Sequence, residues 1–228
     1  MKNQIKDGFK AGLPICIGYL PVAVAFGILA KTTGITLLEA FLFSAVVFAG
    51  ASQFMALNLL ATGVGFSGII LTTLLVNFRH FIMSSYIASR VDNGMKRSFP
   101  LIAFGVTDES FSVLSFKKGE LSRNFIIVLE GVAYISWVTG TISGYILGGF
   151  LPALLVKSMG IALYAMFVAL LMPEVKKSYR AFILALSAGV LNSFLIYLDL
   201  LPKGWSIIVT IILVSAIGTF FYEGGDAI

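Results

Sequence analysis

The sequence predicts an all-α fold, a polytopic bundle of about seven to eight transmembrane helices with some spans broken or kinked. Apolar residues make up 58% of the 228 residues and charged residues 12%, whereas soluble domains average about 25% charged residues. The mean hydropathy of +0.98 shows that the apolar excess is not confined to one segment. A soluble protein cannot bury that much apolar surface, so the composition indicates an integral membrane protein.

Eight apolar segments are long enough for a spanning helix of about 20 residues, and we expect them to form a single membrane domain over residues 1–228. The approximate spans are 12–30, 38–61, 66–88, 98–116, 124–147, 152–172, 181–199 and 205–222. Polar residues interrupt the middle of 98–116, so that segment is either a full span or a broken, re-entrant helix.

The distribution of Lys and Arg predicts the orientation, since these residues favour the cytoplasmic side. With eight spans and a cytoplasmic N-terminus, nine of them lie in the cytoplasmic segments and five in the external loops. The loop with Arg90, Lys96 and Arg97 runs against this bias, and a seven-crossing arrangement would move it. The net charge of +5 lies in short groups between apolar runs, which indicates contact with the lipid bilayer and no nucleic-acid partner.

Three polar clusters lie near the centres of three successive spans. The titratable and amide side chains in them are Gln53, Asn77, Arg79, His80, Asp108 and Glu109. Because each residue adds about 1.5 Å along a helix, the clusters lie at a similar depth, near the bilayer midplane. Secondary transporters place their substrate sites at this depth.

The chemistry of these clusters suits a zwitterionic substrate. Arg79 has a planar fork of donors that fits a carboxylate, and Gln53 and Asn77 add hydrogen bonds without charge. Asp108 completes the candidate substrate-binding set. The alternative is that Arg79 and Asp108 form a structural ion pair between two helices, because an intramembrane charge needs a partner.

Three titratable side chains are candidates for proton coupling: Asp108, Glu109 and His80. Asp108 and Glu109 point about 100° apart on a regular helix, so one acid can pair with Arg79 or substrate while the other carries a proton. We favour Asp108 as the paired acid, since its shorter side chain is more rigid. His80 is the only histidine, and imidazole titrates near neutral pH.

Small residues and prolines mark candidate breaks and packing faces. Pro21 and Gly27 are candidates for a kink or hinge in the first span, as are Gly50 and Ala51 in the second, where close helix packing is the alternative. A small residue recurs at every fourth position of 124–147, on a face that serves helix packing or a partner. This small-residue face consists of Ser136, Gly140, Gly144 and Gly148.

Glu130 lies several residues inside its predicted span, and we expect its side chain to extend to the membrane interface.

No enzyme signature is found, so we predict no catalytic residue and no cofactor. The sequence has no phosphate-binding loop, and Gly50 to Gln53 lack the second glycine of a serine nucleophile elbow. One His and one Cys cannot form the usual protein zinc site, so no metal is expected.

Four motifs resemble, in order and spacing, those of the AzlC-type family, the large subunits of bacterial branched-chain amino acid exporters. They are Gly18-Tyr19-Leu20-Pro21 with Phe26-Gly27, Ala49-Gly50-Ala51-Ser52-Gln53-Phe54, Asn77-Phe78-Arg79-His80, and Phe104-Gly105-Val106-Thr107-Asp108-Glu109. The resemblance covers essentially the whole chain and is most specific between residues 12 and 116. Relatives can carry Asp at position 77, so Asn77 removes a negative charge and puts proton coupling there in doubt.

The resemblance implies a secondary transporter in a bacterial plasma membrane. The substrates would be the branched-chain amino acids valine, leucine and isoleucine, with methionine as a further candidate, and protons would drive export. The transporter would need a much smaller membrane subunit of the AzlD type, for which the small-residue face is a candidate docking surface. Two other classes remain open: a non-catalytic membrane assembly subunit, and a channel for a small polar solute.

Overall fold

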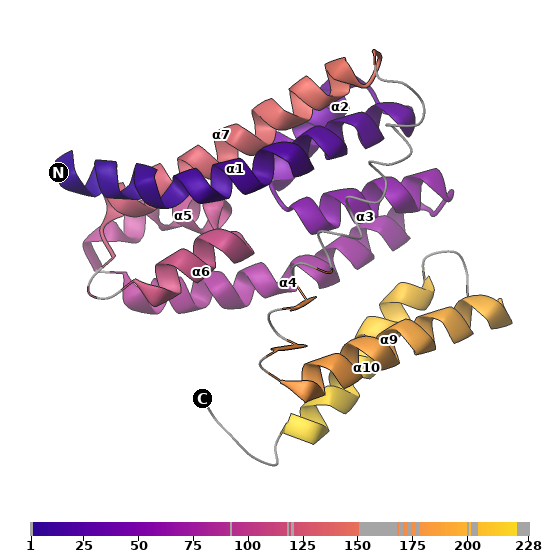
Figure 1. Cartoon of the computed structure of the whole chain (residues 1–228). Helices are drawn as coiled ribbons and strands as arrows, with labels where there is room; N and C mark the ends of the chain where they lie inside the picture. The colour runs from indigo at the N-terminus through magenta and orange to yellow at the C-terminus, as the bar shows by residue number, and fades with distance from the viewer. Residues whose placement is uncertain are drawn as a thin grey trace. The chain divides into compact units, whose positions relative to one another are not determined.

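The structure is a computed structural model that describes residues 2–91, 93–117, 119, 121–150, 178–199, 201 and 205–222, with 168, 171, 172, 175 and 176 in between. Every regular element in these residues is a helix (Figure 1). The elements are α1 (Lys2–Thr32), α2 (Leu37–Leu42), the π-helix η1 (Phe43–Val47), α3 (Gly50–Ala61), α4 (Phe66–Arg90), the 3₁₀ helix η2 (Asn93–Ser98), α5 (Phe99–Gly105), α6 (Asp108–Phe116), α7 (Arg123–Leu147), α9 (Tyr179–Leu198) and α10 (Trp205–Tyr222).

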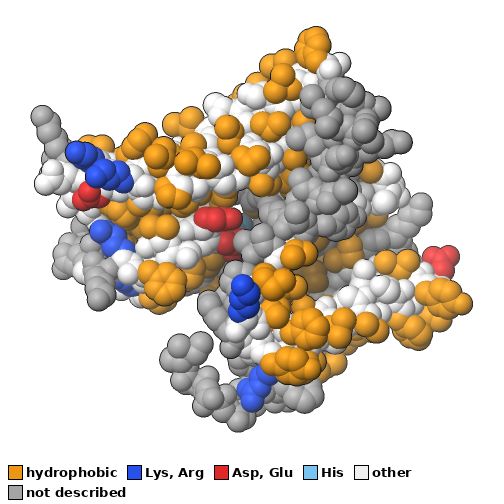
Figure 2. Space-filling model, in the orientation of Figure 1, with side chains coloured by type: hydrophobic (Ala, Val, Ile, Leu, Met, Phe, Trp, Pro, Cys, Tyr) orange, Lys and Arg blue, Asp and Glu red, His pale blue; other side chains and the backbone are white. Residues whose placement is uncertain are grey.

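The prediction of an all-α membrane protein is confirmed. Within the described residues, α1, α4, α7 and α9 are long and apolar enough to cross a membrane. Large apolar side chains are exposed along them, and Figure 2 shows hydrophobic side chains over much of the visible surface. The predicted span 152–172 lies outside the described residues except for 168, 171 and 172, and the number of crossings stays a prediction.

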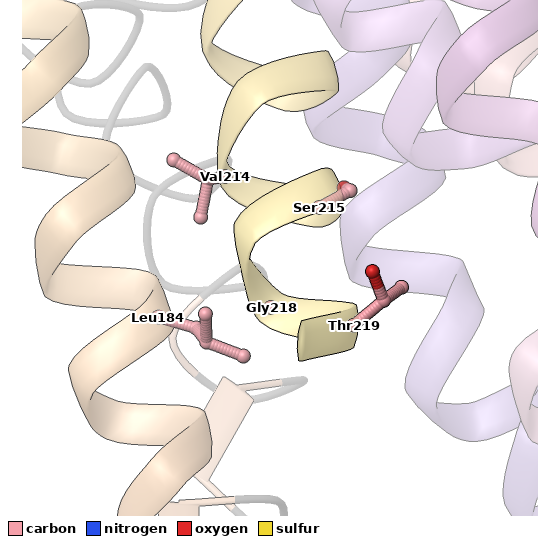
Figure 3. A pocket seen from close by; sticks show the side chains of 5 residues that line it. All are labelled: Leu184, Val214, Ser215, Gly218 and Thr219. Atoms are coloured by element: carbon pink, nitrogen blue, oxygen red, sulfur yellow. The ribbon is translucent and has the colours of Figure 1, made fainter. Parts of the chain in front are cut away.

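The chain forms two compact units, which we describe separately. Unit 1 contains residues 1–57 and 77–163, and unit 2 contains residues 58–76 and 164–228. In unit 2, α9 and α10 line a pocket of about 280 Å³ (Figure 3). Its lining residues are Leu184, Val214, Ser215, Gly218 and Thr219. No charged side chain is among them, so this pocket offers no counter-charge to a zwitterion.

In unit 1, α1 and α7 lie side by side (Figure 1), with small residues at their contact. A Cβ atom on Gly140 would lie 2.6 Å from the Cβ of Ala23, and one on Gly144 would overlap the backbone of Val24. A Cβ on Gly27 would likewise overlap the carbonyl oxygen of Thr141. Glycine therefore allows the two backbones to approach closely.

The small-residue face of α7 is therefore covered by α1 within the chain. Ser136, Gly140 and Gly144 are all buried, and a Cβ on Gly148 would lie 3.4 Å from the Cα of Ile28. Of the two alternatives for this face, helix packing or docking of a partner, the structure shows helix packing within the chain. It is a helix-packing face.

The first break in the helices of unit 1 lies at Phe48 and Ala49, between η1 and α3. Phe48 has φ 44° and ψ 45°, a left-handed conformation that costs a non-glycine residue about 1 kcal/mol. The amide of Ala49 donates a hydrogen bond to Oε1 of Gln53 at 3.1 Å. Backbone groups freed inside a membrane need such internal partners, so Gln53 supports the break.

The second break lies at Val106 and Thr107, between α5 and α6. The amide of Thr107 donates to Oγ of Ser110 at 2.8 Å, and the amide of Ser110 donates to Oγ1 of Thr107 at 3.3 Å. This reciprocal capping satisfies amide groups at the start of α6. Asp108 and Glu109 occupy its first turn, where the helix dipole favours negative charge.

Candidate functional site

An aromatic cluster brings the two breaks together. The ring of Phe48, in the first break, lies 6.2 Å from the ring of Phe104, which is two residues before the second. Tyr134 of α7 lies 5.1 Å from Phe48 and 5.9 Å from Phe104. Its hydroxyl donates to the carbonyl of Ala45 at 2.9 Å. Both discontinuities therefore border the same part of unit 1.

An ion pair connects α4 to the start of α6. Nη2 of Arg79 lies 3.0 Å from Oδ2 of Asp108, and the two side chains are 37% and 30% exposed. Nε of Arg79 is buried and has no hydrogen-bond partner in the described part of the chain. The guanidinium thus keeps donor capacity beyond its contact with Asp108.

A second arginine connects α4 to the other end of α6. Nη1 of Arg90 donates to the carbonyls of Leu114 and Ser115 at 2.9 and 2.8 Å, and Nη2 donates to the carbonyl of Lys117 at 2.7 Å. These are carbonyls at the C-terminus of α6, which lack partners within the helix. Arg79 and Arg90 therefore fix α6 along α4 at both ends.

The adjacent acid, Glu109, faces α1 instead of α4. The hydroxyl of Tyr19 donates to Oε2 of Glu109 at 2.5 Å and lies 2.8 Å from Oγ1 of Thr107. The Tyr19 ring lies 5.3 Å from the ring of Trp137 on α7. The two acids are therefore held by different helices, and only Asp108 pairs with Arg79.

Gln53 takes part in a buried chain of hydrogen bonds that connects α3 with η1 and α7. Its Oε1 accepts from Nε1 of Trp137 at 3.1 Å, and its Nε2 donates to Oγ of Ser44 at 3.1 Å. Oγ of Ser44 lies 2.7 Å from Oγ1 of Thr141, which donates to the carbonyl of Trp137 at 3.0 Å. Gln53 is completely buried, so in this conformation it stabilises the packing of α3 and does not face a substrate.

The remaining candidate binding and proton-coupling residues, His80 and Asn77, lie on α4 with Arg79. His80 follows Arg79 on α4 and is half-buried. Asn77 is half-buried, and its Oδ1 has no hydrogen-bond partner among the described residues.

The candidate hinge residues have different surroundings. Pro21 lies within the continuous helix α1. Gly50 and Ala51 open α3, and a Cβ on Gly50 would lie 2.7 Å from the indole of Trp137.

Two side chains gain a role that sequence reasoning missed. The hydroxyl of Tyr19 lies in the middle of a span, where it needs a hydrogen-bond partner. This requirement was the signal by which the sequence could have identified Tyr19.

Glu130 is only 4% exposed, which overturns the expectation that it extends to the interface. It is buried because it lies on α7 beneath α5, which sequence spacing does not reveal.

The family assignment follows from the stretch that contains these residues. The family model described as AzlC protein matches residues 14–151. This range includes both breaks, the Arg79–Asp108 ion pair and the α1–α7 contacts of Ala23, Val24, Gly27 and Ile28. The chain belongs to the AzlC family.

Relatives of this AzlC family member are membrane proteins. An uncharacterised membrane protein of Archaeoglobus fulgidus is 38% identical over 176 residues, 76% of this chain and 77% of the relative. The inner membrane protein YgaZ of Escherichia coli is 34% identical over 194 residues, 81% of this chain and 79% of the relative. The branched-chain amino acid transport protein AzlC of Bacillus subtilis is 28% identical over 160 residues, 65% and 61% of the two chains. No solved structure matches the chain significantly.

Proposed function

We propose that this chain is the large subunit of a secondary active transporter that exports branched-chain amino acids. The observation that carries the proposal is the partly exposed Arg79–Asp108 pair at the second break, with Glu109 beside Asp108 in the first turn of α6. A free amino acid has one carboxylate and one ammonium group. Arg79 offers donors to the first, and Asp108 offers a carboxylate to the second.

Substrate binding in this scheme replaces one ion pair by two. The amino acid carboxylate takes the place of Asp108 on Arg79, and the ammonium group neutralises the released Asp108. Charge inside the membrane remains balanced in both states, which intramembrane charges require. The Bacillus subtilis relative is named as a branched-chain amino acid transport protein, which supports this substrate class.

The coupling ion in this proposal is the proton, and the site offers three titratable groups for it. Glu109 follows Asp108 and His80 follows Arg79 in the sequence, and neither is part of the Arg79–Asp108 ion pair. The transporter works in a bacterial plasma membrane with a cytoplasmic N-terminus and with a small AzlD-type subunit. Since α1 covers the small-residue face of α7, we place that subunit on another apolar surface.

Efflux from cells tests the proposal directly. Cells that express the chain with and without the small subunit are preloaded with an isoleucine-containing dipeptide, and extruded isoleucine is measured over time. We expect saturable efflux that needs both chains and stops when the proton gradient is dissipated. No extrusion with both chains present would contradict the proposal, and efflux that rises without saturation would favour a channel.

The same ion pair also fits an assembly subunit with purely structural charges. In that case Arg79 and Asp108 would serve only to hold α6 on α4, as Arg90 does at its other end. A variant with both Arg79→Leu and Asp108→Leu separates the two functions. It would preserve the activity of an assembly subunit if it folds, whereas a transporter would lose substrate binding.

A further inference from the structure

Glu130 of α7 is a buried carboxyl group that has no partner among the described residues. Its side chain is 4% exposed, and its Oε1 makes no hydrogen bond in the part of the chain that the structure describes. Within those residues, the ion pair of Arg79 is with Asp108, so it does not neutralise Glu130. Buried polar groups normally have partners, which makes this carboxyl an exception that needs an explanation.

The carboxyl group lines a pocket of about 260 Å³ between α5 and α7, within unit 1. The other lining residues are Leu101, Phe104, Gly105, Ile127, Gly131 and Tyr134. Two of these residues are glycines and the other side chains are aliphatic or aromatic. The hydroxyl of Tyr134 donates to the carbonyl of Ala45. The pocket walls therefore offer Glu130 no counter-charge, although the volume has room for several water molecules.

Contact with Gly105 connects this carboxyl to the second break. A Cβ atom on Gly105 would lie 2.5 Å from Oε2 and 2.8 Å from Cδ of Glu130. Only glycine leaves space for the carboxyl at this position. Gly105 is the last residue of α5, and Asp108, three residues later, pairs with Arg79. A movement of α5 off Glu130 would therefore act on the chain that holds Asp108.

The charges around Glu130 do not neutralise it either. Among the described residues, α1, α2, η1, α5 and α6 pack on α7, α3 touches it through Trp137, and Lys117 lies over the ring of Phe125. No titratable side chain lies on η1, α3 or α5. Titratable side chains described on α1, α2 and α6 are Lys6, Asp7, Lys10, Cys16, Tyr19, Lys31, Glu39, Asp108 and Glu109, and α7 adds Arg123, Tyr134 and Tyr145. None of these described groups is hydrogen-bonded or ion-paired to Glu130.

We propose that Glu130 binds and releases a proton, and that α5 closes over the carboxyl group when it is protonated. An ionised carboxylate loses a large hydration free energy in an apolar pocket without a partner. The neutral acid therefore fits the pocket as the structure shows it. Ionisation, with the proton passed to water, requires water around the carboxylate, and a movement of α5, whose Gly105 lies against the carboxyl group, would admit it. The coupling of this movement to transport rests on the proposed function.

Infrared difference spectroscopy tests proton binding without any transport assay. The full chain is reconstituted in lipid at neutral pH, and the C=O stretching band of protonated carboxyl groups is compared between wild type and variants. We expect Glu130→Gln to lose one carboxyl's intensity and Glu130→Asp to shift the band. The control Glu39→Gln removes an exposed helix-capping carboxylate and should leave the band unchanged. A band that is identical in wild type and in both Glu130 variants would overturn the proposal.

A second measurement addresses the link to transport. In vesicles that contain both subunits, Glu130→Gln should retain exchange of labelled for unlabelled amino acid but lose acceleration by an imposed pH gradient. Two results would refute the coupling role of Glu130. One is that a pH gradient accelerates transport by Glu130→Gln as much as transport by the wild type. The other is that a sodium gradient, and not a pH gradient, accelerates transport by the wild type. If wild type moves no amino acid at all, the proposed function fails, while the infrared result still decides whether Glu130 holds a proton.

Discussion

The hydroxyl of Tyr19 donates a hydrogen bond to the carboxylate of Glu109, which lies 90 residues later in the chain. Tyr19 belongs to α1, which packs along α7, and Glu109 belongs to the first turn of α6. This contact directs Glu109 towards the α1–α7 pair, while Asp108 faces Arg79 on α4. Two adjacent acids are thereby given different partners.

Replacement of Tyr19 by Phe keeps the ring and removes only the hydroxyl. The Glu109 carboxylate would lose a donor, and hydrogen bonds to charged groups contribute about 1.5–3 kcal/mol. We expect a lower melting temperature and impaired transport in Tyr19→Phe. Thermal unfolding of the purified protein and vesicle transport measure these effects.

The matched control for this variant is Tyr86→Phe. The ring of Tyr86 packs against Phe111, and its side chain is 44% exposed. Equal melting temperatures and transport rates in the two variants would show that the Tyr19–Glu109 bond has no importance for the site.

Replacement of Arg79 by Lys keeps the positive charge but loses the planar fork. A lysine can still neutralise Asp108, but it cannot present two parallel donors to a substrate carboxylate. We expect folded protein with severely impaired amino acid binding, measured by isothermal titration or by transport. Arg97→Lys, at an exposed position of η2, is the control. Near-normal transport by Arg79→Lys would reduce Arg79 to a structural charge.

The polar residues in the spans show how far sequence reasoning reaches. Three clusters at similar depth indicated a polar site, and two of them, at Arg79 and Asp108, do meet in the structure. Gln53 belongs to the third cluster but is completely buried, because the break at Phe48 and Ala49 needs its acceptor. A sequence pattern shows that a span contains a polar group. It does not show whether this group faces a cavity or forms hydrogen bonds with free backbone groups.

Helix partners are equally hidden from the sequence. The spacing of Gly140, Gly144 and Gly148 predicts a smooth face, but it does not specify what covers this face. The structure shows that α1 does, through Gly27 and its neighbours. Glu130 is a similar case, since its burial depends on α5 and on Gly105, which is 25 residues away in the chain. Only tertiary packing brings these two residues into contact.

Replacement of Gly27 by Ala tests the α1–α7 contact. The added methyl group would overlap the carbonyl oxygen of Thr141, and backbone atoms cannot move away as a side chain can. We expect Gly27→Ala to destabilise the protein by about 1–3 kcal/mol, as overpacking typically does, measured by thermal unfolding in detergent.

The same helix provides a matched control in Gly18. A Cβ on Gly18 would have no atom within 4 Å, and alanine is the better helix former by about 1 kcal/mol. Gly18→Ala should therefore leave stability unchanged or increase it. A Gly27→Ala variant as stable as Gly18→Ala would contradict the close approach of the two helices.

Replacement of Gln53 by Leu tests the support of the first break. The amide of Ala49 and Nε1 of Trp137 would both lose their acceptor, and an unsatisfied buried donor costs about 1–3 kcal/mol. Since Trp137→Phe removes one of these donors, the double variant should lose less stability than the two single variants combined. Additive losses in this double-mutant cycle would show that Gln53 and Trp137 do not interact.

The two adjacent acids give the last prediction, which compares Asp108→Asn with Glu109→Gln. Asp108 forms the ion pair with Arg79, so its amide variant leaves the guanidinium without a counter-charge and removes the carboxylate offered to the substrate ammonium group. We expect Asp108→Asn to lose amino acid binding itself.

Glu109→Gln should behave differently. An amide at position 109 can still accept the hydrogen bond from Tyr19, so the break and the ion pair remain in place. We expect this variant to bind and exchange amino acid, but to respond less to an imposed pH gradient if Glu109 takes part in proton coupling. Both variants are measured in the same vesicles, by equilibrium exchange and by pH-driven transport.

The pattern of losses separates the candidates for the coupling site. Loss of pH-driven transport in Glu109→Gln with intact exchange assigns a coupling role to Glu109 beside Arg79 and Asp108. An unaffected pH response in both variants would exclude the two acids from coupling. The proton would then have to use His80, which follows Arg79 on α4, or Glu130 beneath α5. His80→Gln and Glu130→Gln, measured in the same assay, would decide between these two groups.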